Sequence, residues 1–224
     1  MFPELDKVKG IIFDLDGTLY RMRWYMRPFL TIMLFPNMMR LPRFLKIRGR
    51  YAGVDLESPA ALYQEVVKQL APFEKKSEET LLRWIDKHFY KAFVDVMIFL
   101  RNSRPHVNKT LQILKQHGFK LAVLSDYDRI PERLDNLKID KSVFTIMTSS
   151  ESFGALKPSP VPFKKIAAKW NLDPSEVLVI GDRDDTDGEG ARRAGMKFIH
   201  IVEKPINSDK NKMSWIDAIK YLSH

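Results

Sequence analysis

The chain has 224 residues, of which 45% are hydrophobic and 29% charged, a balance typical of a soluble globular protein. It contains no cysteine, which excludes disulfides, thiolate metal sites and a cysteine nucleophile. The formal net charge is +9, and much of the excess lies in residues 17–54, where no acidic residue occurs. The N-terminus lacks the pattern of a signal peptide, and no run approaches the roughly 20 apolar residues that span a bilayer, so we expect a cytoplasmic protein.

The first predicted element is a strand over residues 8–16, in which an apolar run ends in two carboxylates, Asp14 and Asp16. Residues two apart in an extended chain point the same way, so these two side chains are expected to face one spot. Gly17 permits a sharp exit from the strand, and Thr18 adds a hydroxyl. Burying carboxylates there is costly unless a cation or donors compensate. The stretch indicates a divalent cation beside a reactive carboxylate, although alone it could be a strand-ending turn.

Residues 20–104 are predicted to be mostly helical, with no clear strand. Ser58 is placed to cap a helix that closes before Pro72. Ser77 opens a second helix, whose apolar residues recur at helical spacing to about Leu100. The earlier part is predicted to form short helices, with breaks at Pro28, Pro36 and Pro42.

From Pro105 on, the predicted helices and strands alternate. The predicted strands cover residues 119–124, 144–148, 176–180 and 197–202, the last strand of the chain. The predicted helices cover residues 107–117, 131–137, 160–171, 186–194 and 217–222. This alternation predicts βαβ units, and hence an α/β fold with a Rossmann-like parallel sheet sandwiched by helices. We expect a core of residues 1–19 and 105–224, with an all-helical cap domain, residues 20–104, inserted over the carboxyl edge of the sheet.

Three later stretches place polar groups after predicted strands. Ser125 and Asp126 follow one strand, and Lys157 precedes a proline, which keeps it extended. Alone, the serine could equally cap a turn, and a lysine is normally solvated. The third stretch crowds four acids behind a buried strand: Asp182, Asp184, Asp185 and Asp187. A solvated acidic loop could explain two of these acids, but it does not easily explain Asp182 at the strand end.

The carboxyl ends of parallel strands share one edge of a sheet, so these pieces are predicted to form one site. Asp14 and Asp182 would offer oxygen ligands suited to octahedral Mg²⁺. Ser125 and Thr18 would hold phosphate oxygens, and Lys157 would neutralise charge near them.

The sequence resembles the haloacid dehalogenase-like hydrolase superfamily, whose members are mostly magnesium-dependent phosphatases. Its four motifs occur in order as Asp14-Leu-Asp-Gly-Thr18, Ser125, Lys157 before Pro158, and Gly181-Asp-Arg-Asp-Asp-Thr-Asp187. The resemblance covers residues 8–18 and about 105–202. It implies that the insert is a cap, but says little else about it.

The resemblance implies a role for each motif residue. Asp14 attacks phosphorus and carries an aspartyl-phosphate, while Asp16 protonates the leaving group and then activates water. Lys157 positions Asp14 and stabilises the transferring group. The phosphate-binding residues are Thr18, Ser125, Asp126 and Lys157. Mg²⁺ is implied to bind the Asp14 carboxylate, the Asp16 backbone carbonyl and Asp182, and Asp187 supports it. Many relatives carry Asn in place of Asp126, and Glu189 adds a further negative charge beside the last motif.

The expected function is Mg²⁺-dependent hydrolysis of a small phosphorylated metabolite, a phosphomonoester. Branches of the family that displace halide lack an acid at the position of Asp16, so its presence favours phosphate esters. A phosphomutase is an alternative, as is a non-hydrolytic member that binds nucleic acid, a membrane or a protein through its basic segment. The arginines of that segment could be solvated, could face the cleft and attract a polyanionic phosphate, or could contact anionic lipid or nucleic acid. The substrate and the oligomeric state are left open.

Overall fold

The computed structural model describes residues 6–100, 103–204 and 212–222. Six strands within these residues form one sheet in the order β3-β2-β1-β4-β5-β6, and every neighbouring pair is parallel. The strands are β1 (Gly10–Phe13), β2 (Lys120–Ser125), β3 (Ile146–Ser149), β4 (Val177–Gly181), β5 (Lys197–Ile201) and β6 (Lys212–Met213).

The central strand, β1, is buried along its whole length, as expected of a parallel strand covered on both faces. Phe13 lies opposite Val123 of β2 and Ile180 of β4, so all three strands end at the same level. The strand is shorter than the predicted residues 8–16, because the chain turns where Thr18 N–H bonds to the Leu15 carbonyl. The residues that follow these strands therefore emerge together at one edge.

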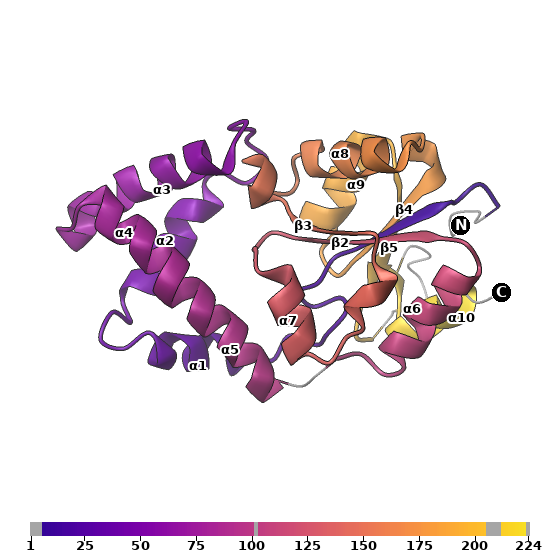
Figure 1. Cartoon of the computed structure of the whole chain (residues 1–224), viewed down its shortest axis with the longest axis horizontal. Coiled ribbons are helices and arrows are strands. Elements are labelled where there is room, and N and C mark those ends of the chain that lie inside the picture. Colours follow the sequence, from indigo (N-terminus) through magenta and orange to yellow (C-terminus); the bar gives the residue numbers. More distant parts are fainter. Residues whose placement is uncertain (1–5, 101–102, 205–211, 223–224) are drawn as a thin grey trace.

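Helices cover both faces of the sheet, so the predicted α/β Rossmann-like fold is confirmed (Figure 1). On one face lie α8 (Val161–Trp170) and α9 (Glu189–Ala194). On the other lie α6 (Val107–Gln116), α7 (Ile130–Asn136) and α10 (Trp215–Leu222). A hydrophobic core lies on each face of the sheet, and alternate residues of β1 point into one or the other. Ile11 and Phe13 pack in the first core, and Ile12 packs in the second.

The segment between β1 and α6 is helical and lies beyond the carboxyl edge of the sheet, on the left of Figure 1. Its elements are α1 (Met26–Met33), α2 (Arg40–Gly49), α3 (Pro59–Glu74), α4 (Glu78–Trp84), the π-helical turn η1 (Ile85–Phe89) and α5 (Tyr90–Leu100). We call this segment the helical insert. Ser58 and Ser77 cap α3 and α4 as predicted, accepting bonds of 3.1 and 3.3 Å from backbone N–H groups. The division into a core and a cap domain stays a prediction.

Of the three predicted proline breaks in the helical insert, only Pro36 lies between two helices, α1 and α2. Pro28 and Pro42 lie in the first turns of α1 and α2, where an N–H group has no helical partner to lose. Pro72 lies inside α3, which was predicted to close before it. The last turn is held by Glu74, whose carboxylate accepts 2.9 Å bonds from the side chains of Arg40 and Arg43. Tertiary ion pairs thus offset the backbone bond lost at the proline.

The predicted last strand, residues 197–202, is followed by another strand, β6, which pairs with β5 at the edge of the sheet. Two residues are too few to show a periodic pattern, so β6 could not be predicted from the sequence. The remaining turns are η2 (Lys141–Val143), η3 (Glu151–Phe153), η4 (Pro174–Glu176) and η5 (Asp184–Gly188). Among the described residues, no helix combines the length and the apolar character needed to cross a membrane.

Candidate active site

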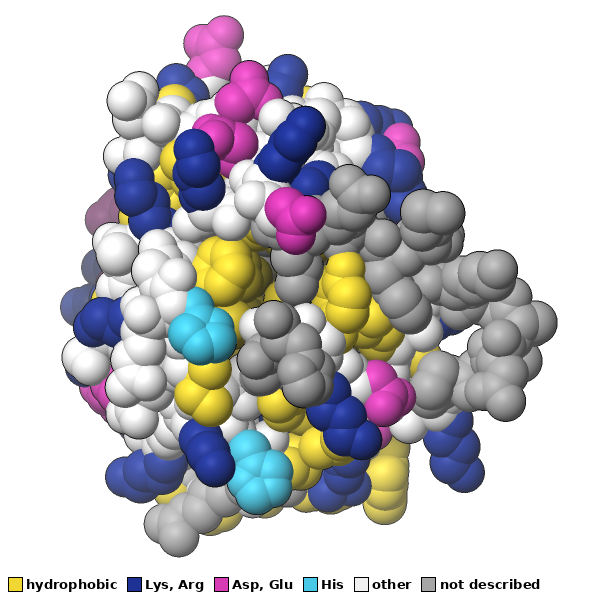
Figure 2. Space-filling model, turned by 90° about the vertical axis from the view of Figure 1, so that its right-hand side faces the viewer, with side chains coloured by type: hydrophobic (Ala, Val, Ile, Leu, Met, Phe, Trp, Pro, Cys, Tyr) yellow, Lys and Arg dark blue, Asp and Glu magenta, His cyan; other side chains and the backbone are white. Residues whose placement is uncertain are grey.

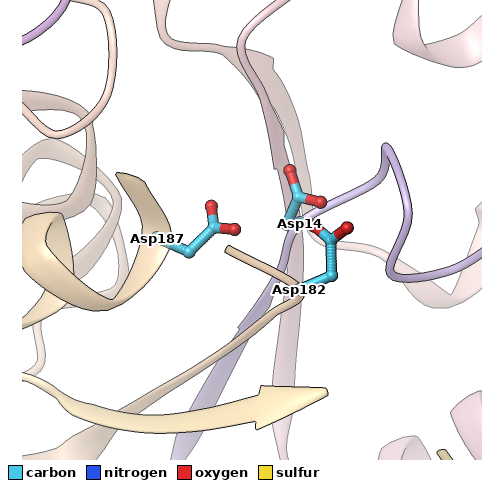
Figure 3. Close-up of side chains that lie close together, drawn as sticks. All are labelled: Asp14, Asp182 and Asp187. Carbon is cyan, nitrogen blue, oxygen red and sulfur yellow. The ribbon is translucent and has the colours of Figure 1, made fainter. Parts of the chain in front are cut away.

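Three acidic side chains meet at the carboxyl edge of the sheet. Asp14 follows β1, Asp182 follows β4, and Asp187 lies on the helical turn η5. Figure 3 shows their carboxylates directed into a shared space. One carboxylate oxygen from each of the three lies within 4.8 Å of the others. The predicted meeting of Asp14 and Asp182 is therefore present in the structure.

Lys157 joins this acidic cluster from the loop that follows η3. Its Nζ lies 2.7 Å from Asp14 Oδ1 and 2.7 Å from Asp187 Oδ1. Only 2% of the side chain is exposed, so it is not the solvated lysine that its sequence context alone would suggest. The ammonium therefore holds two of the three carboxylates in fixed positions.

The acidic cluster has the properties of a site for a hard divalent cation. Three carboxylates face one ammonium group, and Asp182 Oδ1 is buried with no hydrogen-bond partner among the residues that the structure describes. Burial, reinforced by the charge of Asp14, raises the pKa of Asp182 to about 7. Burial likewise raises the pKa of Asp14 to about 7, although Lys157 opposes the shift. A cation with a preference for oxygen ligands would relieve both the repulsion and the unsatisfied oxygen.

Gly17 allows the first and last motifs to approach each other. Its φ of +98° lies in the left-handed region, which residues with side chains rarely adopt. A Cβ atom at this position would lie 2.0 Å from Asp182 Oδ2. A side chain here would therefore displace Asp182 from the cluster.

Asp16 lies beside the acidic cluster and has donors of its own. The Tyr20 hydroxyl donates to Oδ1 over 2.6 Å, and the Ser125 hydroxyl donates to Oδ2 over 2.7 Å. The Arg133 guanidinium forms an ion pair with Oδ1. Burial alone would raise the pKa of Asp16, but Arg133 and the hydroxyl donors outweigh it and hold the pKa below its ordinary value. Asp14 and Asp16 thus differ sharply in environment, although they are two residues apart.

Arg133 is a site residue that the sequence reasoning missed. Its side chain is fully buried, and Nη1 donates to Ser125 Oγ over 2.9 Å and to the Tyr127 carbonyl over 3.0 Å. Its guanidinium also lies 4.6 Å from the ring centroid of Phe93 in the helical insert. A signal was available, because Arg133 falls on the apolar stripe of α7 between Ile130 and Leu137. A charge on the buried face of a helix requires a buried partner.

Comparison with known proteins assigns the family. The sequence model of the haloacid dehalogenase-like hydrolases matches residues 8–195. The chain belongs to this family. The family is the one that the resemblance implied, and the matched range spans the helical insert as well as the motif residues.

Relatives within the haloacid dehalogenase-like hydrolases include named phosphatases. The chain is 27% identical to the glyceraldehyde 3-phosphate phosphatase of Methanocaldococcus jannaschii, over 96% of this chain and 95% of that protein. It is 35% identical to the phosphoglycolate phosphatase of Pasteurella multocida, over 88% and 87%. The fold is also shared with a 2-haloacid dehalogenase from Pseudomonas syringae, at a TM-score of 0.64 and 22% identity over 96% and 98% of the two chains. The fold alone therefore does not select the reaction.

The residues expected to bind phosphate in this family all lie at the same edge, but each has a protein partner. The Thr18 hydroxyl donates to Asp14 Oδ2 over 2.9 Å, and that of Ser125 donates to Asp16. Asp126 Oδ1 accepts the backbone N–H of Lys157 over 3.1 Å. In this structure these side chains orient the two motif aspartates and the lysine loop, and their contacts with phosphate stay predictions.

The last family motif separates its acids into two pairs. Asp182 and Asp187 point inward, whereas Asp184 and Asp185 are exposed. Asp184 pairs with Arg192, and Asp185 with Arg183. A solvated loop thus accounts for two of the four acids. Glu189 is partly exposed and forms ion pairs with Arg192 and Arg193.

A second buried polar cluster joins the helical insert to the sheet and was also missed. Glu151, which is 2% exposed, accepts bonds from Arg48 Nη2 over 3.0 Å and from the Tyr63 hydroxyl over 2.6 Å. Tyr90 also donates to it, as does the backbone N–H of Asp128 over 2.9 Å. Arg48, Tyr63 and Tyr90 come from α2, α3 and α5. One buried carboxylate therefore ties three helices of the insert to the loops after β2 and β3.

Proposed function

We propose that this chain is a magnesium-dependent phosphatase that hydrolyses a phosphomonoester of a small metabolite through an aspartyl-phosphate. The main support is the acidic cluster, in which the carboxylate of Asp14 is held by Lys157 and Thr18 beside Asp182 and Asp187. The names of the relatives support a phosphate ester as substrate. A cytoplasmic location, expected from the sequence, stays a prediction.

The residues present fit a magnesium ion. Asp14, Asp182 and Asp187 would hold it, together with the Asp16 backbone carbonyl implied by the family resemblance. The bound ion would neutralise phosphate oxygens and the neighbouring carboxylates, which otherwise repel a phosphate ester. Lys157 would add a second positive charge on the same side of Asp14.

The roles of the chain's own groups follow from their surroundings. The Asp14 carboxylate attacks phosphorus, and the bond from phosphorus to the ester oxygen breaks as the aspartyl-phosphate forms. Asp16, whose pKa is held below its ordinary value here, first takes up a proton from solvent and gives it to the departing oxygen, and it then takes one from the water that hydrolyses the aspartyl-phosphate. Arg133, Tyr20 and Ser125 position Asp16 for these transfers. Lys157 fixes Asp14 throughout and stabilises the negative charge that develops.

Phosphate release from an aryl phosphate tests the proposal directly. We expect release with Mg²⁺, loss of activity with EDTA, and a loss of at least about a thousandfold in kcat for Asp14→Asn. Asp185→Asn is a matched control, because this aspartate is exposed and lies outside the acidic cluster, so its activity should be unchanged. Full activity of Asp14→Asn would exclude the covalent step. Activity that persists in EDTA would exclude the metal.

Substrate choice is tested with a panel of phosphorylated metabolites. Glyceraldehyde 3-phosphate and phosphoglycolate are the first to assay, because the relatives are named for them. The non-hydrolytic alternative predicts no turnover of any member of the panel. A phosphomutase would return a rearranged sugar phosphate instead of free phosphate.

A further inference from the structure

Large apolar side chains are exposed around α1, at one end of the helical insert. Trp24 is 86% exposed and Phe35 is 75% exposed, although both are side chains that normally pack in cores. Others that are more than a third exposed in this region are Met22, Tyr25, Ile32, Met39, Ile98 and Phe99. The ring of Phe99, at the end of α5, lies 5.1 Å from that of Phe29 in α1, so the two helices expose their apolar residues side by side.

The exposed apolar residues of α1 follow the helical repeat. Pro28 and Ile32 are four residues apart on its outer side, and Trp24 and Phe35 continue this row at either end. The inner side is also apolar, with Met26 and Leu30 buried in the core of the insert. The only polar residues of α1 are Arg27 and Thr31, so the rest of its outer side is apolar, where a surface helix normally carries polar side chains. The outer row, which we call the α1 face (Trp24, Pro28, Ile32 and Phe35), has no cover among the described residues.

The charge beside the α1 face is mostly positive: Asp95 lines the same pocket as Phe35 but is paired with Lys91, and Lys87 lies there too. Residues 17–54 contain no acid. Several arginines of this segment have partners elsewhere, as Arg40 and Arg43 pair with Glu74. Arg23 and Arg27 differ, because both are exposed and neither forms an ion pair with another described residue. The opposite end of the molecule, which Figure 2 shows, carries acidic side chains among its Lys and Arg residues. The mixed charge of that end contrasts with Arg23 and Arg27 beside the α1 face, which are unpaired among the described residues.

We propose that the α1 face docks on an anionic lipid surface. Arg23 and Arg27 would meet the headgroups, while Trp24, Ile32 and Phe35 would enter the boundary between headgroups and acyl chains. A lipid surface offers negative charge and hydrocarbon together, which matches both properties of the patch. A second copy of the chain would bring like charges together. Nucleic acid could pair with the arginines, but it has no hydrocarbon surface in which to bury Ile32. The chain would lie on the membrane, and this inference does not depend on the catalytic proposal.

Vesicle sedimentation tests the lipid proposal. The full chain is mixed with vesicles of phosphatidylcholine alone, or of phosphatidylcholine with phosphatidylglycerol, at low and at high salt. We expect binding to the anionic vesicles, little binding to the neutral ones, and weaker binding as salt screens the charges. Phosphatase activity on a soluble ester is measured in parallel as a check of folding.

Matched variants separate the apolar and the basic contributions. Ile32→Ser with Phe35→Ser should weaken binding by at least about tenfold, because both apolar anchors are lost. Phe73→Ser with Ile216→Ser removes the same two residue types from exposed positions outside the patch and should bind normally. Neither pair lies in the active site, so activity should be retained in both. Each arginine contributes roughly fivefold at an anionic surface, so Arg23→Glu with Arg27→Glu should weaken binding by about 30-fold or more.

The control for the basic contribution is Lys164→Glu with Lys165→Glu, an equal change of charge at exposed positions of α8. If the arginine pair and the lysine pair of substitutions weakened vesicle binding equally, the proposal would be overturned, because net charge alone would then explain binding. Absence of binding to anionic vesicles, or equal binding to neutral ones, would also overturn it. Self-association that is abolished by Ile32→Ser with Phe35→Ser, without vesicle binding, would assign the α1 face to a second copy. Binding to an oligonucleotide but not to vesicles would likewise refute a lipid partner.

Discussion

The buried ion pair between Arg133 and Asp16 gives the sharpest test of how the site is built. Arg133→Met keeps most of the apolar stem and its packing against Phe93, but removes the charge. Asp16 would then retain only the hydroxyl donors Tyr20 and Ser125. The buried carboxylate would thus lose the one cation that pairs with it in the described part of the chain.

Removing one member of a buried ion pair typically costs about 3–5 kcal/mol of unfolding free energy. Two hydroxyl donors remain, and the Asp16 side chain is 16% exposed, so we expect the lower end of this range, about 3 kcal/mol at pH 7. The sign of the pH dependence follows from the lowered pKa of Asp16. Its charged form stabilises the fold above the unfolded pKa of about 4, and this contribution is lost as the pH falls through the lower folded pKa. The difference in unfolding free energy between the wild type and Arg133→Met should therefore become smaller as the pH falls below about 4.

Urea denaturation at pH 7 and at pH 3 measures this difference, because the lower value lies below the unfolded pKa of Asp16. Arg129→Met is the matched control, because Arg129 is half exposed and its partner Asp86 is exposed, so the loss should stay below about 1 kcal/mol. Adding Asp16→Asn to Arg133→Met should recover part of the stability, because no buried charge is then left without a partner. A loss for Arg133→Met as small as that of the control, or no recovery in the double variant, would refute the reasoning.

Two further predictions concern the other buried clusters. Because burial raises the pKa values of Asp14 and Asp182 to about 7, magnesium must displace protons at lower pH. Magnesium should then raise the melting temperature more at pH 8 than at pH 6. Equal shifts in melting temperature at the two pH values would contradict magnesium binding by Asp14 and Asp182. Glu151→Gln leaves the buried Arg48 without its carboxylate and should cost about 3 kcal/mol in urea denaturation. Glu189→Gln, in an exposed ion pair, should cost less than about 1 kcal/mol, so equal losses in these two variants would argue against the buried pair.

The sequence predicted the parts of the site that depend on local patterns. An apolar run followed by Asp14, or by Ser125, marks the end of a buried strand, and parallel strands bring such ends to one edge. Partners distant in sequence left no comparable pattern. Arg133 and Asp16 are 117 residues apart, and Arg48 and Glu151 are 103 apart. Helix ends such as that of α3 were mispredicted for the same reason, since contacts from another helix decide them.

The two missed arginines converge on one loop, residues 125–128, directly after β2. Arg133 holds this loop from α7 through the Ser125 hydroxyl and the Tyr127 carbonyl. Arg48 holds it from the helical insert, donating to the Asp126 carbonyl and lying 4.2 Å from the ring centroid of Tyr127. Because the Ser125 hydroxyl donates to Asp16, the loop that positions Asp16 is fixed by both the insert and α7. The placement of the helical insert and the orientation of Asp16 are therefore physically linked, although no motif residue lies in the insert.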